Sequence, residues 1–305
     1  MALGFVMLGK GADWFVEGAA GIAMRFGIPQ LVIGLTIVAM GTSAPEAAVS
    51  IAAAVKGNAD ITIGNIVGSN ILNILVILGL AASIVPIAVA RSTVRIEIPF
   101  MIGVTALLFY QGRDSSISLA DGGVLMVAFA AYMMYLYTMA MKSNVDSDLE
   151  EPGLPLGRCL LGAVGGLALI IAGSNVTVGA ATSIATYAGL SERFIGLTIV
   201  ALGTSLPELF TSVAAARRGN ADIAIGNIVG SNIFNILFVV GLSSLIIDIP
   251  FASAFNFDTY VALGAAVLLW LCVLRTQRLQ RWAGALMLMC YAAYLGIFCK
   301  HSIIM

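Results

Sequence analysis

The sequence predicts an all-α membrane protein with ten transmembrane helices, arranged as two inverted five-helix repeats in which helices 2 and 7 are broken. Three observations support this fold class. The 305 residues are 60% hydrophobic and 10% charged, whereas soluble domains carry about 25% charged residues. Ten apolar segments are suited to cross a bilayer. Residues 33–80 recur as residues 195–242 without a gap and with 35 identities in 48 positions.

Each predicted span approaches the ~20 apolar residues that a helix needs to cross the hydrocarbon core. The longest polar interval contains four acidic residues and lies within residues 142–157, which we interpret as the linker between the two repeats. The first repeat is then 1–141 and the second is 158–305. The ten expected spans are 2–24, 29–55, 61–85, 97–112, 119–141, 158–183, 191–216, 222–247, 258–274 and 281–299.

The basic residues predict the orientation of these spans. An odd number of spans per repeat turns the second repeat upside down relative to the first. If the N-terminus is outside, the inner loops hold ten Lys and Arg residues and the outer loops hold four, as the positive-inside rule requires. We therefore expect a plasma-membrane protein with both termini outside and the linker 142–157 in the cytoplasm. Inverted repeats with broken helices are typical of secondary transporters, which bind substrates near the midplane.

The duplicated segments, 29–85 and 191–247, each place a glutamate beside a proline inside an apolar span. Residues 41–46 read GTSAPE, and residues 203–208 read GTSLPE. A carboxylate at the bilayer centre costs at least ~2.5 kcal/mol, so Glu46 and Glu208 are predicted to be functional. Pro45 has no N–H to donate to the carbonyl of Gly41, so the helix should break here and expose carbonyl oxygens.

The residues around each glutamate offer only oxygen ligands. Thr42 and Ser43 precede Glu46, and the next span carries polar residues at helical spacing, with Ser69 and Asn73 among them. Calcium takes six to eight oxygen ligands, and sodium also accepts oxygen. Zinc or copper would require imidazole or thiolate, whereas the chain has one histidine and four cysteines without a CxxC motif. We expect transported Ca²⁺ and Na⁺, no cofactor, no nucleic-acid partner and no implied protein partner.

Two groups of polar residues remain open to more than one interpretation. Asp13 and Glu17 in the first span could line an ion path or form a polar contact between helices, and the second interpretation is favoured. Four asparagines of the duplicated segments could bind ions or serve only helix packing and capping; they are Asn65, Asn70, Asn227 and Asn232.

These motifs resemble the signature of the calcium/cation antiporter superfamily, specifically that of prokaryotic sodium/calcium exchangers. The resemblance covers nearly the whole chain and includes the GTSxPE and GSNIxNI motifs in both repeats. It implies electrogenic exchange, commonly of three sodium ions for one calcium ion, at positions between spans 2, 3, 7 and 8. In this family, spans 1 and 6 slide across that core. The implied metal ligands are Thr42, Ser43, Glu46, Ser69, Asn73, Thr204, Ser205, Glu208, Ser231 and Asn235, with backbone carbonyls near Ala39 and Ala201.

One residue departs from several members of that family. Asn235 stands where they carry aspartate, so the site has two acids and not three. The function expected is antiport of sodium against calcium with calcium extrusion. The alternative is an antiporter of calcium, or another divalent cation, against protons on the same fold, in which the two glutamates carry the protons. A cation channel fits inverted repeats less well. An enzyme is not expected, because no nucleophile or water-activating metal set accompanies the two glutamates.

Overall fold

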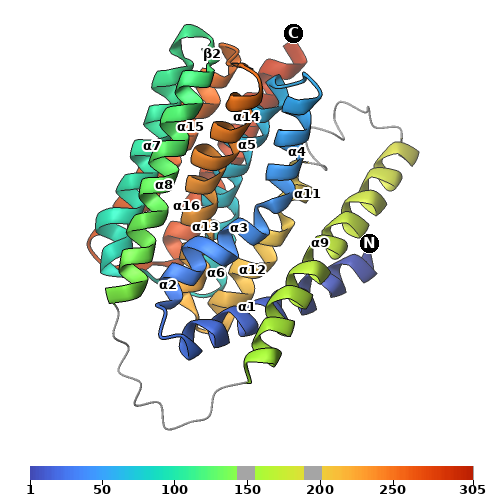
Figure 1. Cartoon of the computed structure of the whole chain (residues 1–305). Coiled ribbons are helices and arrows are strands. Elements are labelled where there is room, and N and C mark those ends of the chain that lie inside the picture. Colours follow the sequence, from blue (N-terminus) through green and yellow to red (C-terminus); the bar gives the residue numbers. More distant parts are fainter. Residues whose placement is uncertain (143–154, 189–200, 305) are drawn as a thin grey trace.

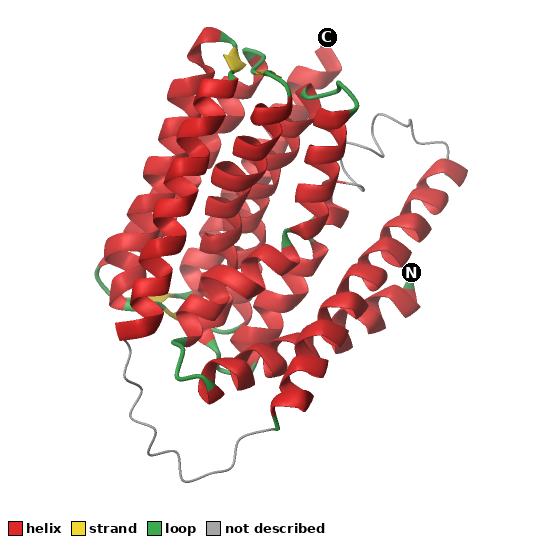
Figure 2. Ribbon diagram, viewed as in Figure 1, coloured by secondary structure: helices red, strands yellow, loops and turns green. Residues whose placement is uncertain are grey.

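The computed structural model describes residues 1–142, 155–188 and 201–304. They form a bundle of helices, with short antiparallel strand pairs at the helix ends (Figure 1, Figure 2). Most of the predicted linker and the first part of the span predicted at 191–216 lie outside the described residues. Two strand pairs join the repeats: β1 (Ile87–Ala88) with β4 (Arg278–Leu279), and β2 (Ser116–Ile117) with β3 (Ile249–Pro250).

The helices of the first repeat follow the predicted spans, and several contain a π-helical turn. The fourth span begins at Thr93, four residues before the predicted start. The elements are α1 (Ala2–Arg25), α2 (Gln30–Ile33), η1 (Gly34–Val38), α3 (Ala39–Thr42), α4 (Ala44–Val55), α5 (Asp60–Leu72), η2 (Asn73–Leu78), α6 (Gly79–Ile84), η3 (Thr93–Glu97), α7 (Ile98–Gln111), η4 (Gly112–Asp114) and α8 (Leu119–Lys142).

The described part of the second repeat follows a similar order of elements, without counterparts of η3 and η4. Its first helix is longer than the corresponding helix of the first repeat. The elements are α9 (Leu156–Tyr187), α11 (Ala201–Thr204), α12 (Leu206–Arg217), α13 (Ala221–Phe234), η6 (Asn235–Val240), α14 (Gly241–Ile246), α15 (Ala254–Leu274) and α16 (Arg281–Ile304).

Within the described ranges, six helical segments are long and apolar enough to cross a membrane, and a bent pair adds a seventh candidate. The bent pair consists of Gln30–Thr42 and Ala44–Val55, which meet at 51°. The first helix, α1, is largely apolar, but Lys10, Asp13 and Glu17 interrupt it and Arg25 ends it. The chain is therefore an all-helical, multi-span membrane protein.

The duplicated segments lie at the centre of the bundle. In the most apolar part of each span, 94% of the residues are buried for Ala221–Ile246 and 78% for Ile61–Ile84, whereas 17% are buried for Leu119–Lys142 at the periphery. Helices α1 and α9 pack side by side and cross the bundle obliquely (Figure 1). Glycines permit this close contact, since a Cβ atom on Gly11 would lie 2.8 Å from the carbonyl oxygen of Gly166. Small residues bring membrane helices together in this way.

Candidate cation site

Both glutamates lie immediately after a helix break. Ser43 (φ −82°, ψ 6°) separates α3 from α4, and Ser205 (φ −88°, ψ 4°) separates α11 from α12. The predicted break beside Pro45 is confirmed, and it falls two residues before the proline because the first helical turn tolerates proline. Glu46 and Glu208 occupy the first turns of α4 and α12, where the helix dipole favours a negative charge.

The two carboxyl groups are buried and are held across the repeat boundary. Each glutamate is 1% exposed. The Ser43 hydroxyl donates a hydrogen bond to Glu208 Oε1 at 2.7 Å, and the Ser205 hydroxyl donates one to Glu46 Oε1 at 3.1 Å. The two glutamates are also close enough for their charges to interact. The structure thus brings together the two acids that the sequence singles out, although they lie 162 residues apart.

Four asparagines connect the repeats on the helices that pack against α4 and α12. The amide nitrogens of Asn70 and Asn232 donate to each other's backbone carbonyl oxygens, at 3.2 Å in both directions. Asn73 Nδ2 donates to Asn232 Oδ1 at 2.9 Å, and Asn235 Nδ2 donates to Asn70 Oδ1 at 3.1 Å. Asn70 and Asn232 therefore serve helix packing. Their side chains also fix which way the amides of Asn73 and Asn235 point.

Four buried oxygens of this region accept no hydrogen bond from the described residues. They are Oε2 of Glu46, Oε2 of Glu208, Oδ1 of Asn73 and Oδ1 of Asn235. Each repeat contributes one carboxylate oxygen and one amide oxygen at equivalent positions, and every one of the four is an acceptor. An unsatisfied buried acceptor costs about 1–3 kcal/mol, and a cation can satisfy several such acceptors at once. The region thus has the chemistry of a cation site.

The predicted hydroxyl residues lie on the same central helices, and several of them bond to other groups in this structure. The Thr42 hydroxyl lies 2.9 Å from Asn227 Oδ1 and 3.1 Å from the Val38 carbonyl oxygen. The Ser231 hydroxyl donates to the Ala39 carbonyl oxygen at 3.3 Å. Thr204 interacts with Glu46, and Ser69 is 3% exposed. All ten predicted site residues therefore lie on the broken helices or the adjacent central helices.

Other residues position the glutamates, and sequence reasoning missed some of them. Asn65 Nδ2 donates to Ser50 Oγ at 2.9 Å, and Asn227 Nδ2 donates to Ser212 Oγ at the same distance. Asn65 also donates to the Glu46 carbonyl oxygen at 3.2 Å. Their role as packing residues was one of the two interpretations left open. Ser50 and Ser212 were not predicted, although both are present at the same place in the duplicated segment.

Asn73 and Asn235 each begin a π-helical turn, η2 and η6. Such turns are frequent at functional sites, and no feature of the sequence predicted them here. Among the described side chains, no cluster of three or more His, Cys, Asp or Glu residues is placed to hold a metal ion. Any cation at this centre would therefore depend on amide and hydroxyl oxygens in addition to the two carboxylates.

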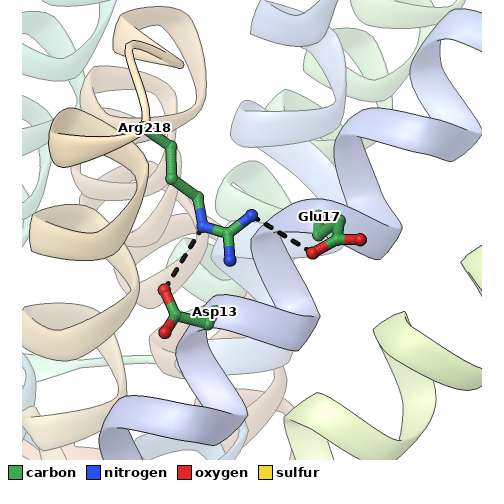
Figure 3. Close-up of polar contacts among 3 residues, drawn as sticks. All are labelled: Asp13, Glu17 and Arg218. Atoms are coloured by element: carbon green, nitrogen blue, oxygen red, sulfur yellow. Dashed lines mark hydrogen bonds and ion pairs between the residues drawn. The ribbon is translucent and has the colours of Figure 1, made fainter.

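Asp13 and Glu17 form a contact between helices. Arg218, directly after α12, places its Nε atom 3.2 Å from Asp13 Oδ1 and its Nη1 atom 3.2 Å from Glu17 Oε2 (Figure 3). The interpretation as a polar inter-helix contact is therefore confirmed. Glu97, which the sequence analysis did not single out, is fully buried and accepts a hydrogen bond from Tyr135. It lies on η3, outside the duplicated segments.

Comparison with known proteins accounts for this arrangement. A family model described as sodium/calcium exchanger protein matches residues 1–138 and 159–300. The chain belongs to the sodium/calcium exchanger family. Its similarity to CaxA of Alkalimonas amylolytica is 41% identity over 303 residues, which is 96% of this chain and 95% of CaxA. The inner membrane protein YrbG of Escherichia coli is 39% identical over 259 residues, 81% of this chain and 78% of YrbG.

The solved structures give the same relationship in three dimensions. The sodium-calcium exchanger NCX_Mj, in crystals soaked with Na⁺ and Ca²⁺, superposes with a TM-score of 0.86 and 33% sequence identity. The match covers 97% of this chain and 96% of NCX_Mj. This member of the exchanger family is therefore a cation antiporter with an NCX_Mj-like fold, and it is a transporter and not an enzyme.

Proposed function

We propose that this antiporter exchanges sodium for calcium and extrudes calcium from the cell. The observation that carries the proposal is the set of four buried, donorless oxygens on Glu46, Glu208, Asn73 and Asn235. Two carboxylates neutralise one divalent cation, and the amide oxygens add neutral ligands of the kind that calcium accepts. A buried charge is costly unless it is paired or coordinates a cation, and neither acid has a basic partner among the described residues, so the two are suited to a cationic cargo.

The proposed ligands come in equal number from both repeats. Hydroxyl and backbone carbonyl oxygens complete the coordination of sodium ions at overlapping positions, with the carbonyl of Ala39 as one candidate. The side chains that we assign to the transported ions are Thr42, Ser43, Glu46, Ser69, Asn73, Thr204, Ser205, Glu208, Ser231 and Asn235.

The same proposal includes ten membrane spans in two inverted repeats, 1–141 and 158–305. This part of the proposal is supported by hydrogen bonds that equivalent residues of the two repeats donate to each other, as Asn70 and Asn232 do. Equivalent residues meet in this way when a two-fold axis relates the repeats. The glycine contacts agree, since Gly11 faces Gly166 and the equivalent residues Gly173 and Gly4 also face each other.

We place the protein in the plasma membrane with both termini outside and the linker 142–157 in the cytoplasm. The excess of Lys and Arg in the loops assigned to the cytoplasm, ten against four, supports this orientation. YrbG, named as an inner membrane protein, supports the choice of membrane.

The proposal is tested by the uptake of radioactive calcium into sodium-loaded proteoliposomes. Wild-type protein should take up calcium only when sodium is higher inside than outside, and the Glu208→Gln variant should not. Glu97→Gln is the matched control, because it neutralises a buried acid outside the proposed site and should leave uptake intact. Uptake that ignores sodium and follows a proton gradient would contradict the proposal and favour exchange of calcium for protons.

A further inference from the structure

Helices α1 and α9 are equivalent in the two repeats, but they do not make equivalent contacts with the core. The offset of 162 residues relates α1 to α9 and relates α4 to α12. In the structure, α1 packs along α12, whereas no comparable contact joins the described part of α9 to α4. The α1–α9 pair is therefore not placed symmetrically between the two repeats but is shifted toward α12. Because α9 is equivalent to α1 and α4 is equivalent to α12, the duplication also predicts a second arrangement, in which α9 packs on α4.

Ionic contacts occur on the side where the pair is docked. Arg218 binds Asp13 and Glu17 at the same time, with both distances at 3.2 Å (Figure 3). The two acids are four residues apart on α1 and therefore lie on one face of the helix. Guanidinium presents several N–H donors in a fixed fork, so one arginine can hold both carboxylates and fix α1 against the end of α12.

The equivalent place in the first repeat has the same backbone and a basic residue. Lys56 follows α4 as Arg218 follows α12, with backbone angles of −84° and 0° for Lys56 and −83° and −1° for Arg218. The next residues, Gly57 and Gly219, have φ values of 79° and 80°. The loop that carries the basic side chain is thus the same in both repeats.

The acids, in contrast, occur only in the first repeat. The residues of α9 equivalent to Asp13 and Glu17 are Asn175 and Gly179. If α9 docked on α4, Lys56 would meet an amide and a glycine in place of two carboxylates. The ionic contacts therefore favour only one of the two arrangements.

We propose that Arg218, Asp13 and Glu17 form an ionic latch that stabilises the arrangement with α1 docked on α12. This inference rests on the proposed exchange, since the latch affects function only if the transporter alternates between these two arrangements. With the orientation proposed above, Arg218 lies at the cytoplasmic end of the core, so the latch keeps the cytoplasmic side closed. Arg218 is in this sense a positioning residue: it touches no ion and biases the equilibrium between the two arrangements.

The free energy that the latch contributes depends on how exposed the side chains of Arg218, Asp13 and Glu17 are to solvent. Their side chains are 36–44% exposed, so each ion pair is of the partly solvated and modest kind. Loss of both pairs should shift the equilibrium between the arrangements by about tenfold, which corresponds to about 1.4 kcal/mol. A tenfold shift is measurable in a transporter whose two states are otherwise close in energy.

The first test measures the position of α1 directly. Spin labels are attached to Leu3→Cys on α1 and Val127→Cys on α8, both exposed positions, after alanine replaces the four native cysteines. Distance distributions are recorded in lipid nanodiscs by double electron–electron resonance. Arg218→Gln should decrease the ratio of molecules at the docked distance to molecules at the alternative distance by about tenfold. Arg218→Lys, which keeps the charge, should largely retain the wild-type ratio. An unchanged distribution in Arg218→Gln would overturn the latch.

The second test builds the latch on the other side. The double variant Asn175→Asp with Gly179→Glu gives α9 the two acids of α1, and no atom of the described residues lies within 4 Å of a Cβ added at Gly179. It should favour the arrangement in which α9 meets Lys56, and adding Lys56→Gln should reverse that effect. No shift in the double variant would contradict the proposal. Since these distances are measured without transport, the latch and the proposed exchange can fail separately.

Discussion

The number of acids at the site predicts which half of the transport cycle carries charge. With Glu46 and Glu208 as the two carboxylates that we assign to the site, a site that holds one Ca²⁺ is neutral. If three Na⁺ replace one Ca²⁺, as the family resemblance implies, the sodium-loaded site carries one positive charge. Moving one elementary charge across the membrane corresponds to ~2.3 kcal/mol per 100 mV, or about a 50-fold change in an equilibrium. We therefore expect the sodium-loaded step to depend on voltage and the calcium-loaded step to be nearly independent of it.

The substitution Asn235→Asp should reverse this assignment. A third carboxylate makes the site with three Na⁺ neutral and gives the calcium-loaded site one negative charge. The structure permits the change, because Asn235 Oδ1 accepts no hydrogen bond from the described residues and would be kept as a carboxylate oxygen. Its cost is the hydrogen bond from Asn235 Nδ2 to Asn70 Oδ1, which leaves a buried oxygen unpaired at about 1–3 kcal/mol.

The assay is the transient current that follows a rapid ion jump on proteoliposomes adsorbed to a solid-supported membrane. In the wild type, a sodium jump should give the larger current and a calcium jump without sodium only a small one. In Asn235→Asp the calcium jump should give the larger current. Asn73→Asp, the equivalent change in the other repeat, should behave in the same way. A large calcium current in the wild type, or an unaltered pattern in both variants, would refute this count of charges.

Three further predictions concern single contacts. Ser43→Ala removes a proposed sodium ligand, together with the 2.7 Å bond that orients Glu208; an oxygen ligand worth as much as a hydrogen bond to a charged group, about 1.5–3 kcal/mol, gives at least a tenfold loss of sodium affinity in exchange assays, and unchanged affinity would contradict this. Gly11→Leu should lower the melting temperature in detergent, because its side chain would collide with the backbone of Gly166; an unaltered melting temperature would rule out tight packing there. Glu97→Gln should retain calcium affinity, and its loss would mean that the acid acts on the site.

The fold was predictable from sequence to the extent that it depends on apolar length and duplication. Hydropathy alone indicated the helices, and the proline beside each glutamate indicated the break between α3 and α4. The obliquity of α1 and α9 was not predictable, because it depends on which glycines face each other across two helices that are distant in sequence. The π-helical turns were also not predictable, since a π turn depends on the bonding of neighbouring helices and not on a local residue preference.

The centre of the site was predictable because burying a carboxylate in a membrane is costly, so that Glu46 and Glu208 required an explanation. The orientation of each amide was not, because Asn70 and Asn73 are equally polar in sequence. Only the bonds across the repeats show that Asn70 uses its nitrogen and its oxygens for packing while Asn73 keeps one oxygen free. The partner of Asp13 and Glu17 was also beyond sequence reasoning, since Arg218 lies some 200 residues away.

The two repeats offer nearly the same oxygens to a bound ion, and this has a consequence for direction. Asn235 matches Asn73, just as Glu208 matches Glu46, so an ion that arrives from either side meets an equivalent set of ligands. A difference in affinity between the two faces must then arise mainly outside the site, in the energies of the two positions of α1 and α9. Arg218 and its two acids supply such a difference because their repeat equivalents pair a lysine with an asparagine and a glycine. In this protein, the duplicated centre would thus determine what is bound, and the unduplicated acids on α1 would determine from which side it is bound more readily.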